Sequence, residues 1–209
     1  MGRIVISENV SLDGVVQDPR GEEGLGRGDW FAWITDKDRE EWAEALLAEA
    51  LGAEALLLGR RSYEYFAARF ASRTGEWADR LNSMPKYVVS TTLARADAWN
   101  NSTVLTGDVL SAVSRLRRTA NGEIVVYASG RLARTLIERD LVDELRLMTY
   151  PFVVGAGERL FGRTSGVKRM RLVHTRTVGD GLAFLTYQLV GGAVADCPRP
   201  SRTGGGTTI

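Results

Sequence analysis

The chain has 209 residues, of which 27 are Lys or Arg, 26 are Asp or Glu and one is His, so its formal net charge is only +1. This length is sufficient for one domain with its own hydrophobic core. The near balance of charges excludes the strongly basic surface that attracts nucleic acid or an anionic membrane. We therefore expect a protein that binds neither of them.

The cysteine content and the amino-terminal sequence indicate the cellular compartment of the protein. The only cysteine is Cys197, which excludes an intrachain disulfide and a cysteine-based zinc site and fits a reducing environment. The first apolar run turns polar at Ser7, before an export signal could develop. No apolar run has the length of a membrane span. We expect a cytoplasmic protein without a bound metal.

The first two thirds of the chain alternate between short apolar runs and longer segments with helical periodicity. Strands that alternate with helices favour a mostly parallel sheet with helices on its faces. In chain order, strands are predicted at 3–10, 55–58, 86–89, 103–105 and 124–127, and helices at 36–51, 61–70, 76–81, 109–118 (capped by Asp108) and 131–139.

The pattern changes after residue 140, where strands are predicted at 144–149, 170–178 and 182–189. Gly179-Asp180-Gly181 is a natural hairpin turn between the last two strands. The predicted fold is therefore α/β, with a mostly parallel central sheet, flanking helices and a C-terminal antiparallel hairpin. Residues 1–190 would form one domain, and the glycine- and proline-rich residues 191–209 a flexible tail.

Ligands of open parallel sheets bind where strands end and helices begin, because helix amino ends present free amide donors to phosphates. The first such junction contains Gly59, which allows close backbone approach, and Arg60 and Arg61, which can hold a phosphate. A plain turn with two solvated arginines would have the same sequence.

Two further junctions carry suitable residues. Ser90 and Thr91 follow the strand at 86–89, and their hydroxyls can bind a ribose phosphate or simply cap a turn. The small residues from Ala128 to Gly130 lie between a strand and a helix, which suits a pyrophosphate or tight helix packing.

Six short motifs occur in one order along the chain, at 11–14 (SLDG), 59–64 (GRRSYE), 86–90 (KYVVS), 128–130 (ASG), 141–145 (LVDEL) and 151–161. In this order, over about 4–189, the chain resembles the dihydrofolate reductase superfamily. It is most similar to the branch that contains the C-terminal reductase domain of riboflavin-biosynthesis deaminase-reductases.

The resemblance implies a dihydrofolate reductase-like sheet and NADPH as hydride donor. Arg60 would face the adenosine 2′-phosphate and Arg61 would lie close to the phosphates. Ser90 and Thr91 would complete the 2′-phosphate pocket, and residues 128–131 would hold the pyrophosphate. The cofactor-binding residues implied are Gly59, Arg60, Arg61, Ser90, Thr91, Ala128, Ser129, Gly130 and Arg131.

Three positions depart from the pattern of this branch. Its members carry a lysine directly after the Asp-Gly pair and a glutamate before the glycine run, where this chain has Val15 and Tyr127. Both departures argue against reduction of the riboflavin-pathway ribose. Ala128 replaces the first glycine of the run, which would weaken cofactor binding if the backbone needs a positive φ there.

On the substrate side, Asp13 is the candidate proton donor, although it could equally fix a tight Asp-Gly turn. Trp30 follows a glycine-rich segment, 21–28, that resembles a mobile cover, and its indole could stack on a flat heterocycle or pack the first helix onto the sheet. His174, the only histidine, is interpreted as structural.

Together with these residues, the resemblance implies an NADPH-dependent oxidoreductase that reduces a small, planar heterocyclic substrate by hydride transfer. The alternative is a nucleotide-binding sensor or assembly protein of the same fold without turnover. We also expect a homodimer that pairs through its C-terminal strands, where Leu145 and Leu147 alternate with polar or larger residues.

Overall fold

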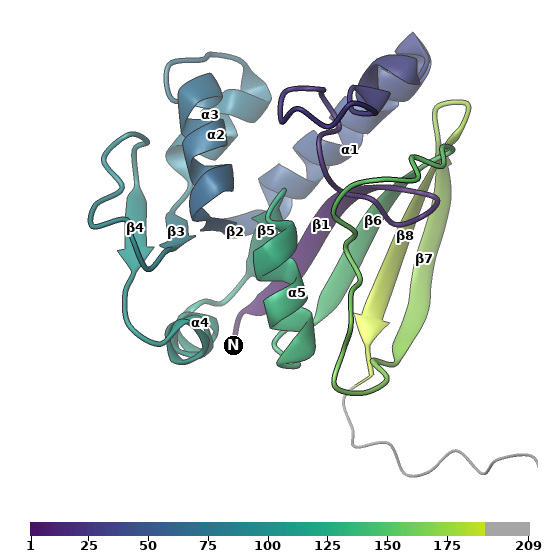
Figure 1. Cartoon of the computed structure of the whole chain (residues 1–209). Helices are drawn as coiled ribbons and strands as arrows, with labels where there is room; N and C mark the ends of the chain where they lie inside the picture. Colours follow the sequence, from purple (N-terminus) through teal and green to yellow (C-terminus); the bar gives the residue numbers. More distant parts are fainter. Residues whose placement is uncertain (191–209) are drawn as a thin grey trace, which may run out of the picture.

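The computed structural model describes residues 1–190, which form an eight-stranded sheet with helices on both faces (Figure 1). The strand order is β4-β3-β2-β5-β1-β6-β8-β7. The strands are β1 (Arg3–Ser11), β2 (Ala53–Gly59), β3 (Lys86–Val89), β4 (Ser102–Leu105), β5 (Glu123–Tyr127), β6 (Glu144–Tyr150), β7 (Met170–Val178) and β8 (Leu182–Leu189). The helices are α1 (Asp36–Gly52), α2 (Arg60–Phe70), α3 (Glu76–Ser83), α4 (Val109–Thr119) and α5 (Gly130–Glu138), with a short 3-10 turn, η1 (Trp30–Trp33).

The α/β architecture predicted from the sequence is confirmed. Strands β1 to β6 pair in parallel, and β7 and β8 form an antiparallel hairpin beside β6. Every predicted helix and strand is present, and each boundary lies within two residues of its prediction. The predicted tail and Cys197 lie outside the described residues. Among residues 1–190 no helix is long and apolar enough to cross a membrane, and the cytoplasmic location stays a prediction.

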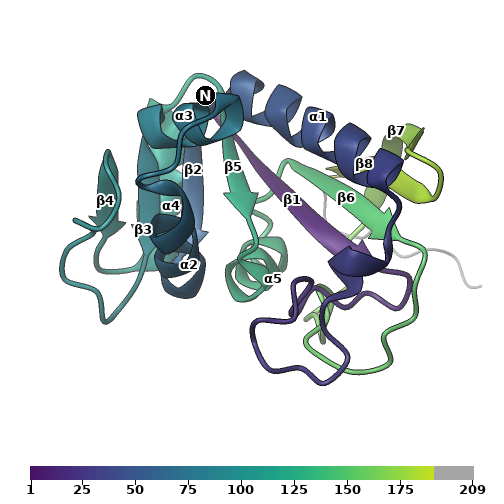
Figure 2. The same cartoon turned by 90° about the horizontal axis from the view of Figure 1, so that it is seen from above.

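Two apolar layers hold the helices against the sheet. Ile4 and Ile6 of β1 pack with α4 and α5 on one face, whereas Val5, between them, packs with the layer beneath α1, α2 and α3 on the other. Figure 2 shows α1 and α5 on opposite sides of β1. Because β1 and β5 are covered on both faces where they pair, each has a continuous apolar run there, 4–6 in β1 and 124–127 in β5, rather than an alternating pattern.

The chain path opens a crevice at the carboxyl ends of β1 and β5. From β1 the chain crosses through α1 to β2, on one side of β5, and from β5 it crosses through α5 to β6, on the other side of β1. Since the two crossover helices cover opposite faces, neither closes the space between the two strand ends. This is the topological switch point where open α/β sheets bind ligands.

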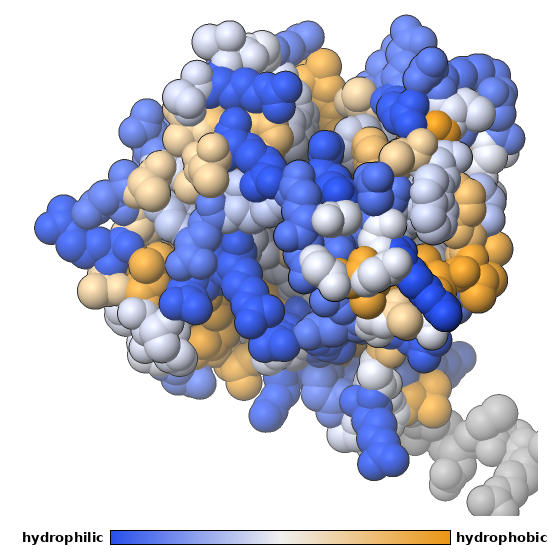
Figure 3. All heavy atoms as spheres, turned by 45° about the horizontal axis from the view of Figure 1, so that its top comes forward, coloured by the Kyte–Doolittle hydropathy of each residue, from blue (hydrophilic) through white to orange (hydrophobic). Residues whose placement is uncertain are grey.

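The outer strand β7 leaves apolar side chains in contact with solvent. Leu172 and Val173 are 48% and 42% exposed, and both lie at an irregularity in the pairing of β7 with β8. Apolar surface gathers on the right-hand side of Figure 3, the side on which Figure 1 draws β8 and β7. Leu145 and Leu147 of β6, which were expected to border a subunit contact, are instead buried in the core.

One buried carboxylate joins α1 to the C-terminal hairpin. Asp38 accepts hydrogen bonds from the backbone N–H groups of Thr35 (2.9 Å), Asp180 (2.7 Å) and Gly181 (3.1 Å). The Thr35 hydroxyl in turn accepts from the N–H of Asp38, which completes a capping box. Burial opposes ionisation of Asp38, but these hydrogen bonds outweigh it and lower its pKa.

We expect Asp38→Ala to lower the free energy of unfolding by about 2 to 3 kcal/mol, because it removes a helix cap and leaves hairpin N–H groups without an acceptor. Asp36→Ala is the matched control, since Asp36 lies in the same helical turn but is fully exposed. Its loss should cost about 0.5 kcal/mol. Urea denaturation of both variants measures the difference, and equal losses would contradict the role assigned to Asp38.

Candidate functional site

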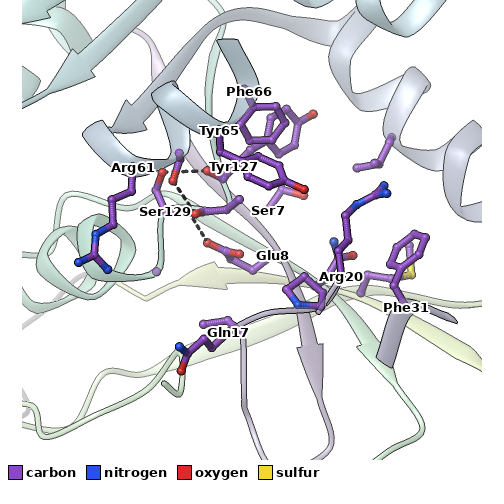
Figure 4. A pocket seen from close by; sticks show the side chains of 18 of the residues that line it. Ser7, Glu8, Gln17, Arg20, Phe31, Arg61, Tyr65, Phe66, Tyr127 and Ser129 are labelled. Atoms are coloured by element: carbon purple, nitrogen blue, oxygen red, sulfur yellow. Dashed lines mark hydrogen bonds between the residues drawn. The ribbon is translucent and has the colours of Figure 1, made fainter. Parts of the chain in front are cut away.

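A cavity of about 1160 Å³ opens at the carboxyl ends of β1, β2 and β5. Its walls come from α1, α2, the amino end of α5 and the segment between β1 and α1 (Figure 4). Small-molecule and cofactor sites occupy about 300–1,000 Å³. The cavity is therefore large enough for a cofactor together with a small second ligand.

Two of the three predicted junctions lie side by side at this cavity. The N–H of Gly59 donates to Oγ of Ser129 (3.0 Å), and Oγ of Ser62 donates to the carbonyl of Ala128 (2.6 Å). The predicted residues Gly59, Arg60, Arg61, Ala128, Ser129, Gly130 and Arg131 all line the cavity. Hydrogen bonds between backbone and side chain thus fasten the end of β2 to the end of β5.

Ser90 and Thr91 do not line the cavity. They follow β3, whose Val89 pairs with Gly59, so they lie next to the first junction. Oγ of Ser90 accepts the N–H of Leu93 (2.9 Å) and stabilises a turn, the alternative that the sequence left open. A part in binding the 2′-phosphate stays a prediction for these two residues.

Ala128 occupies the left-handed region of the backbone, with φ of 47°. A residue with a Cβ atom costs roughly 1–2 kcal/mol in this conformation. Position 128 therefore does have the positive φ that explains why the resembled branch has glycine there. Strain of this kind tends to be retained where the backbone shapes a ligand site.

One end of the cavity is formed by residues 59–61 and 128–131 and is called the phosphate-type end. Several arginines lie at or near this end. Arg131 and Arg134 both pair with Glu158 (2.8 Å each), and their hydrogen bonds lower its pKa to about 2. The nearest carboxylate to Arg60 is that of Glu64, at 3.8 Å. Arg61 makes no ion pair within the described residues, so its guanidinium is available to an anion.

Aromatic side chains line the other end of the cavity. Phe31 meets Trp42 edge to face, with ring centroids 4.7 Å apart, and Tyr65 and Phe66 contribute from α2. Figure 4 shows Phe31 and the two α2 rings around the same space. Such walls suit a flat apolar or heterocyclic ring.

Trp30 lies in the core, contrary to the prediction that it stacks on a substrate. Its side chain is fully buried, meets Tyr150 edge to face at 4.8 Å, and donates from Nε1 to the carbonyl of Gln17 (3.3 Å). Neighbouring side chains of the η1 turn point in different directions. The turn buries Trp30 and presents the next residue, Phe31, to the cavity.

Asp13 is also placed away from the cavity. Its carboxylate accepts hydrogen bonds from the Ser11 hydroxyl (2.7 Å) and from the N–H groups of Val154 (3.0 Å) and Gly155 (2.9 Å), and it pairs with Arg159 (3.3 Å). The Ser11 hydrogen bond, with the others, holds the pKa of Asp13 far below its ordinary value. Asp13 therefore fixes a turn and is not positioned to protonate a ligand.

Glu8 is the cavity residue that sequence reasoning missed. Its side chain is buried in the carboxyl-terminal half of β1, lines the cavity and accepts the N–H of Ser129 at 3.0 Å. Burial raises its pKa to about 8, although the Ser129 N–H and Arg134 act in the opposite direction. The signal in the sequence was an acid two positions after the apolar run of β1, which does not by itself indicate a site.

A second polar group lies at the inner end of the cavity, on the α1 side of the sheet. Glu49 of α1 pairs with Arg146 (3.0 Å), yet burial raises its pKa. The hydroxyl of Tyr127 is buried and has no hydrogen-bond partner within residues 1–190. Both side chains line the cavity, so a ligand that reaches this end meets a carboxyl and a phenol.

We expect Glu8→Gln to change the pH dependence of stability. In the wild type the unfolded chain loses the Glu8 proton near pH 4.5 and the folded protein only near pH 8. Between these values the folded state holds more protons, so rising pH lowers the free energy of unfolding, by up to about 1.4 kcal/mol per pH unit.

The glutamine variant keeps the shape of Glu8 but cannot ionise, so its stability should exceed that of the wild type by an amount that grows from pH 4.5 to pH 8. Chemical denaturation at several pH values measures this difference. Glu64→Gln, at an exposed position of α2, should follow the wild-type curve. Parallel curves for Glu8→Gln and the wild type would show that Glu8 is not held protonated.

The architecture and the position of the cavity define a class of protein. A mostly parallel sheet that ends in an antiparallel hairpin, with a cavity at its switch point, is a dihydrofolate reductase-like fold. The model of the RibD C-terminal domain family matches residues 3–184. The chain therefore belongs to the RibD C-terminal domain family.

Individual proteins that resemble this chain have low sequence identity to it. Protein YyaP of Bacillus subtilis, which is uncharacterized, is 26% identical over 190 residues, covering 88% of this chain and 94% of YyaP. A protein of Shewanella sp. PV-4 named for riboflavin biosynthesis has a similar structure, with a TM-score of 0.71, 20% identity, and coverage of 90% and 99%. Dihydrofolate reductase of Enterococcus faecalis, solved with NADP(H), has a TM-score of 0.57 at 14% identity, with coverage of 90% and 96%.

Proposed function

We propose that this protein is an NADPH-dependent reductase of a small, planar heterocyclic molecule. The observation that carries the proposal is the two-ended cavity. One end joins the amino end of α5 to Arg60 and Arg61, and the other end is walled by aromatic rings. A phosphate-bearing cofactor and a flat substrate would meet between them.

The residues at the first end fit a phosphate-bearing dinucleotide. The amino end of α5 directs backbone N–H groups toward the cavity, which favours a diphosphate. Arg61 is unpaired within the described residues, and two adjacent guanidiniums suit an additional phosphate better than a free ribose diol. The Enterococcus faecalis dihydrofolate reductase, which shares the fold, was solved with NADP(H).

When bound, the nicotinamide would supply the hydride. The work of the chain is to orient the reactants and to keep water out. Gly59 and residues 128–131 would hold the diphosphate, Arg60 and Arg61 the 2′-phosphate, and Phe31, Tyr65 and Phe66 would place the substrate ring against the nicotinamide. Orientation of this kind accounts for a large part of the rate enhancement in hydride transfer.

The substrate would differ from the riboflavin-pathway ribose. The position of the family lysine holds Val15, which is fully buried, and the position of the family glutamate holds Tyr127. Neither residue can hold a sugar phosphate as a charged side chain does. Tyr127 lines the same cavity as the aromatic wall, which favours a flat ring.

A nucleotide-binding protein without turnover is the second candidate, favoured by the structural role of Asp13, the acid first expected to supply a proton. Absorbance of NADPH, followed while candidate heterocycles are added, separates the two. Consumption of NADPH with one of them supports the reductase. Tight NADPH binding without consumption in a broad panel favours the sensor or assembly protein.

We expect wild-type protein to prefer NADPH to NADH, and Arg60→Ala to weaken NADPH binding by about 1.5 to 3 kcal/mol with little effect on NADH, because only NADPH has the 2′-phosphate. Calorimetry measures both affinities. Arg115→Ala, at an exposed position of α4, is the matched control and should change neither. Equal affinity of the wild type for the two cofactors would contradict the assignment of Arg60.

A homodimer that pairs through the C-terminal strands is also proposed. The exposed Leu172 and Val173 on the outer strand β7 support it, since an outer strand with apolar side chains favours pairing with another chain. This contact would lie outside the cavity.

Leu172→Lys should therefore shift the protein from dimer to monomer in sedimentation or light-scattering experiments. Val167→Lys, an equally apolar and more exposed position at 77% in the loop before β7, should leave the dimer intact. A wild-type monomer at micromolar concentration would refute the dimer.

A further inference from the structure

Glu8 is the one acidic side chain that projects from β1 into the phosphate-type end of the cavity, and the proposed hydride transfer assigns it no part. It lies beneath residues 128–131, and Figure 4 shows it pointing toward Ser129, with Gln17 and Arg20 across the cavity. Only 6% of the residue is exposed. A buried carboxyl at a ligand cavity requires an explanation, because ionised groups are costly to bury without partners.

The two carboxyl oxygens of Glu8 have different surroundings. Oε1 accepts the N–H of Ser129 at 3.0 Å. Oε2 has no hydrogen-bond partner in the part of the chain that the structure describes. A carboxyl in this arrangement can carry its proton on Oε2 and donate it to whatever occupies the cavity.

The neighbouring charges do not compensate an ionised Glu8. The charge of Arg134, in α5, favours an ionised Glu8, but this guanidinium binds Glu158 (2.8 Å) and the carbonyl of Arg159 (2.6 Å). Glu158 also holds Arg131. On the opposite face of the sheet, Arg146 forms an ion pair with Glu49 rather than with Glu8.

A dinucleotide would add its own negative charge at this place. Residues 128–131 are the segment proposed to hold the diphosphate, and Glu8 is hydrogen-bonded directly to that segment. An ionised Glu8 and a diphosphate would repel each other across a few ångströms in a largely buried site, where charges are weakly screened. A neutral Glu8 would avoid this repulsion and offer a donor.

We propose that Glu8 is a neutral hydrogen-bond donor to the ligand, and that a phosphate-bearing dinucleotide binds only the protein in which Glu8 is protonated. This inference rests on the proposed function, because it concerns the same cofactor end of the cavity. The pKa of about 8 that burial gives Glu8 supports it, since the side chain is then mostly protonated at neutral pH.

The test is the affinity for NADPH, measured by calorimetry from about pH 7 to about pH 9.5, above the range in which the cofactor's 2′-phosphate titrates. In the wild type the Kd should rise above about pH 8 and approach a tenfold increase per pH unit. In Glu8→Gln the Kd should not follow this rise, because the amide keeps a donor and cannot ionise.

Glu158→Gln is the matched control. It removes a carboxylate from the same end of the cavity, but one with a pKa of about 2, so it should shift the Kd without changing its slope against pH. Calorimetry in buffers of different ionisation enthalpy adds a second readout. Above about pH 8 the wild type should take up a proton on binding NADPH, and Glu8→Gln should take up none.

The possible failures are distinguishable. NADPH binding with the same pH dependence in the wild type and Glu8→Gln would overturn the role of Glu8 and leave the proposed function standing. Wild-type protein that binds no NADPH at any pH would overturn the proposed function and this inference with it.

Discussion

Ser129 is the residue on which the geometry of the site depends, because three strands meet at it. Its N–H donates to Glu8 in the carboxyl-terminal half of β1, its Oγ accepts from Gly59 at the end of β2, and the same Oγ donates to the carbonyl of Tyr127 at the end of β5 (2.8 Å). These contacts hold the first turn of α5 over the crevice. Phosphate-type and aromatic ends of the cavity are thereby fixed relative to each other.

The fold was predictable because its signals are local. Helical periodicity, the Asp108 cap and the glycine hairpin each specify one element, and βα alternation specifies a parallel sheet. The junctions were predictable for a related reason: carboxyl ends of parallel strands share an edge, so Gly59 and Ser129 meet although 70 positions separate them. Only the η1 turn had no signal of its own.

The orientation of single side chains was harder to predict from the sequence. Asp13 looked catalytic because it follows a strand, but its role is set by Val154 and Gly155, which are remote in sequence. Trp30 was misplaced because one step along a 3-10 turn decides which ring enters the core and which ring, here that of Phe31, lines the cavity. Glu8 was missed because its significance depends on burial beneath α5, which no local pattern records.

A crystal structure of the protein with NADPH tests the central claim most directly, namely that the cavity at the switch point is a dinucleotide site. The account predicts the diphosphate at the amino end of α5, within hydrogen-bond distance of the backbone N–H groups of Gly130 or Arg131, and the nicotinamide facing Phe31 and Tyr65. NADPH bound elsewhere on the molecule, or a cavity that stays empty at saturating NADPH, would contradict it.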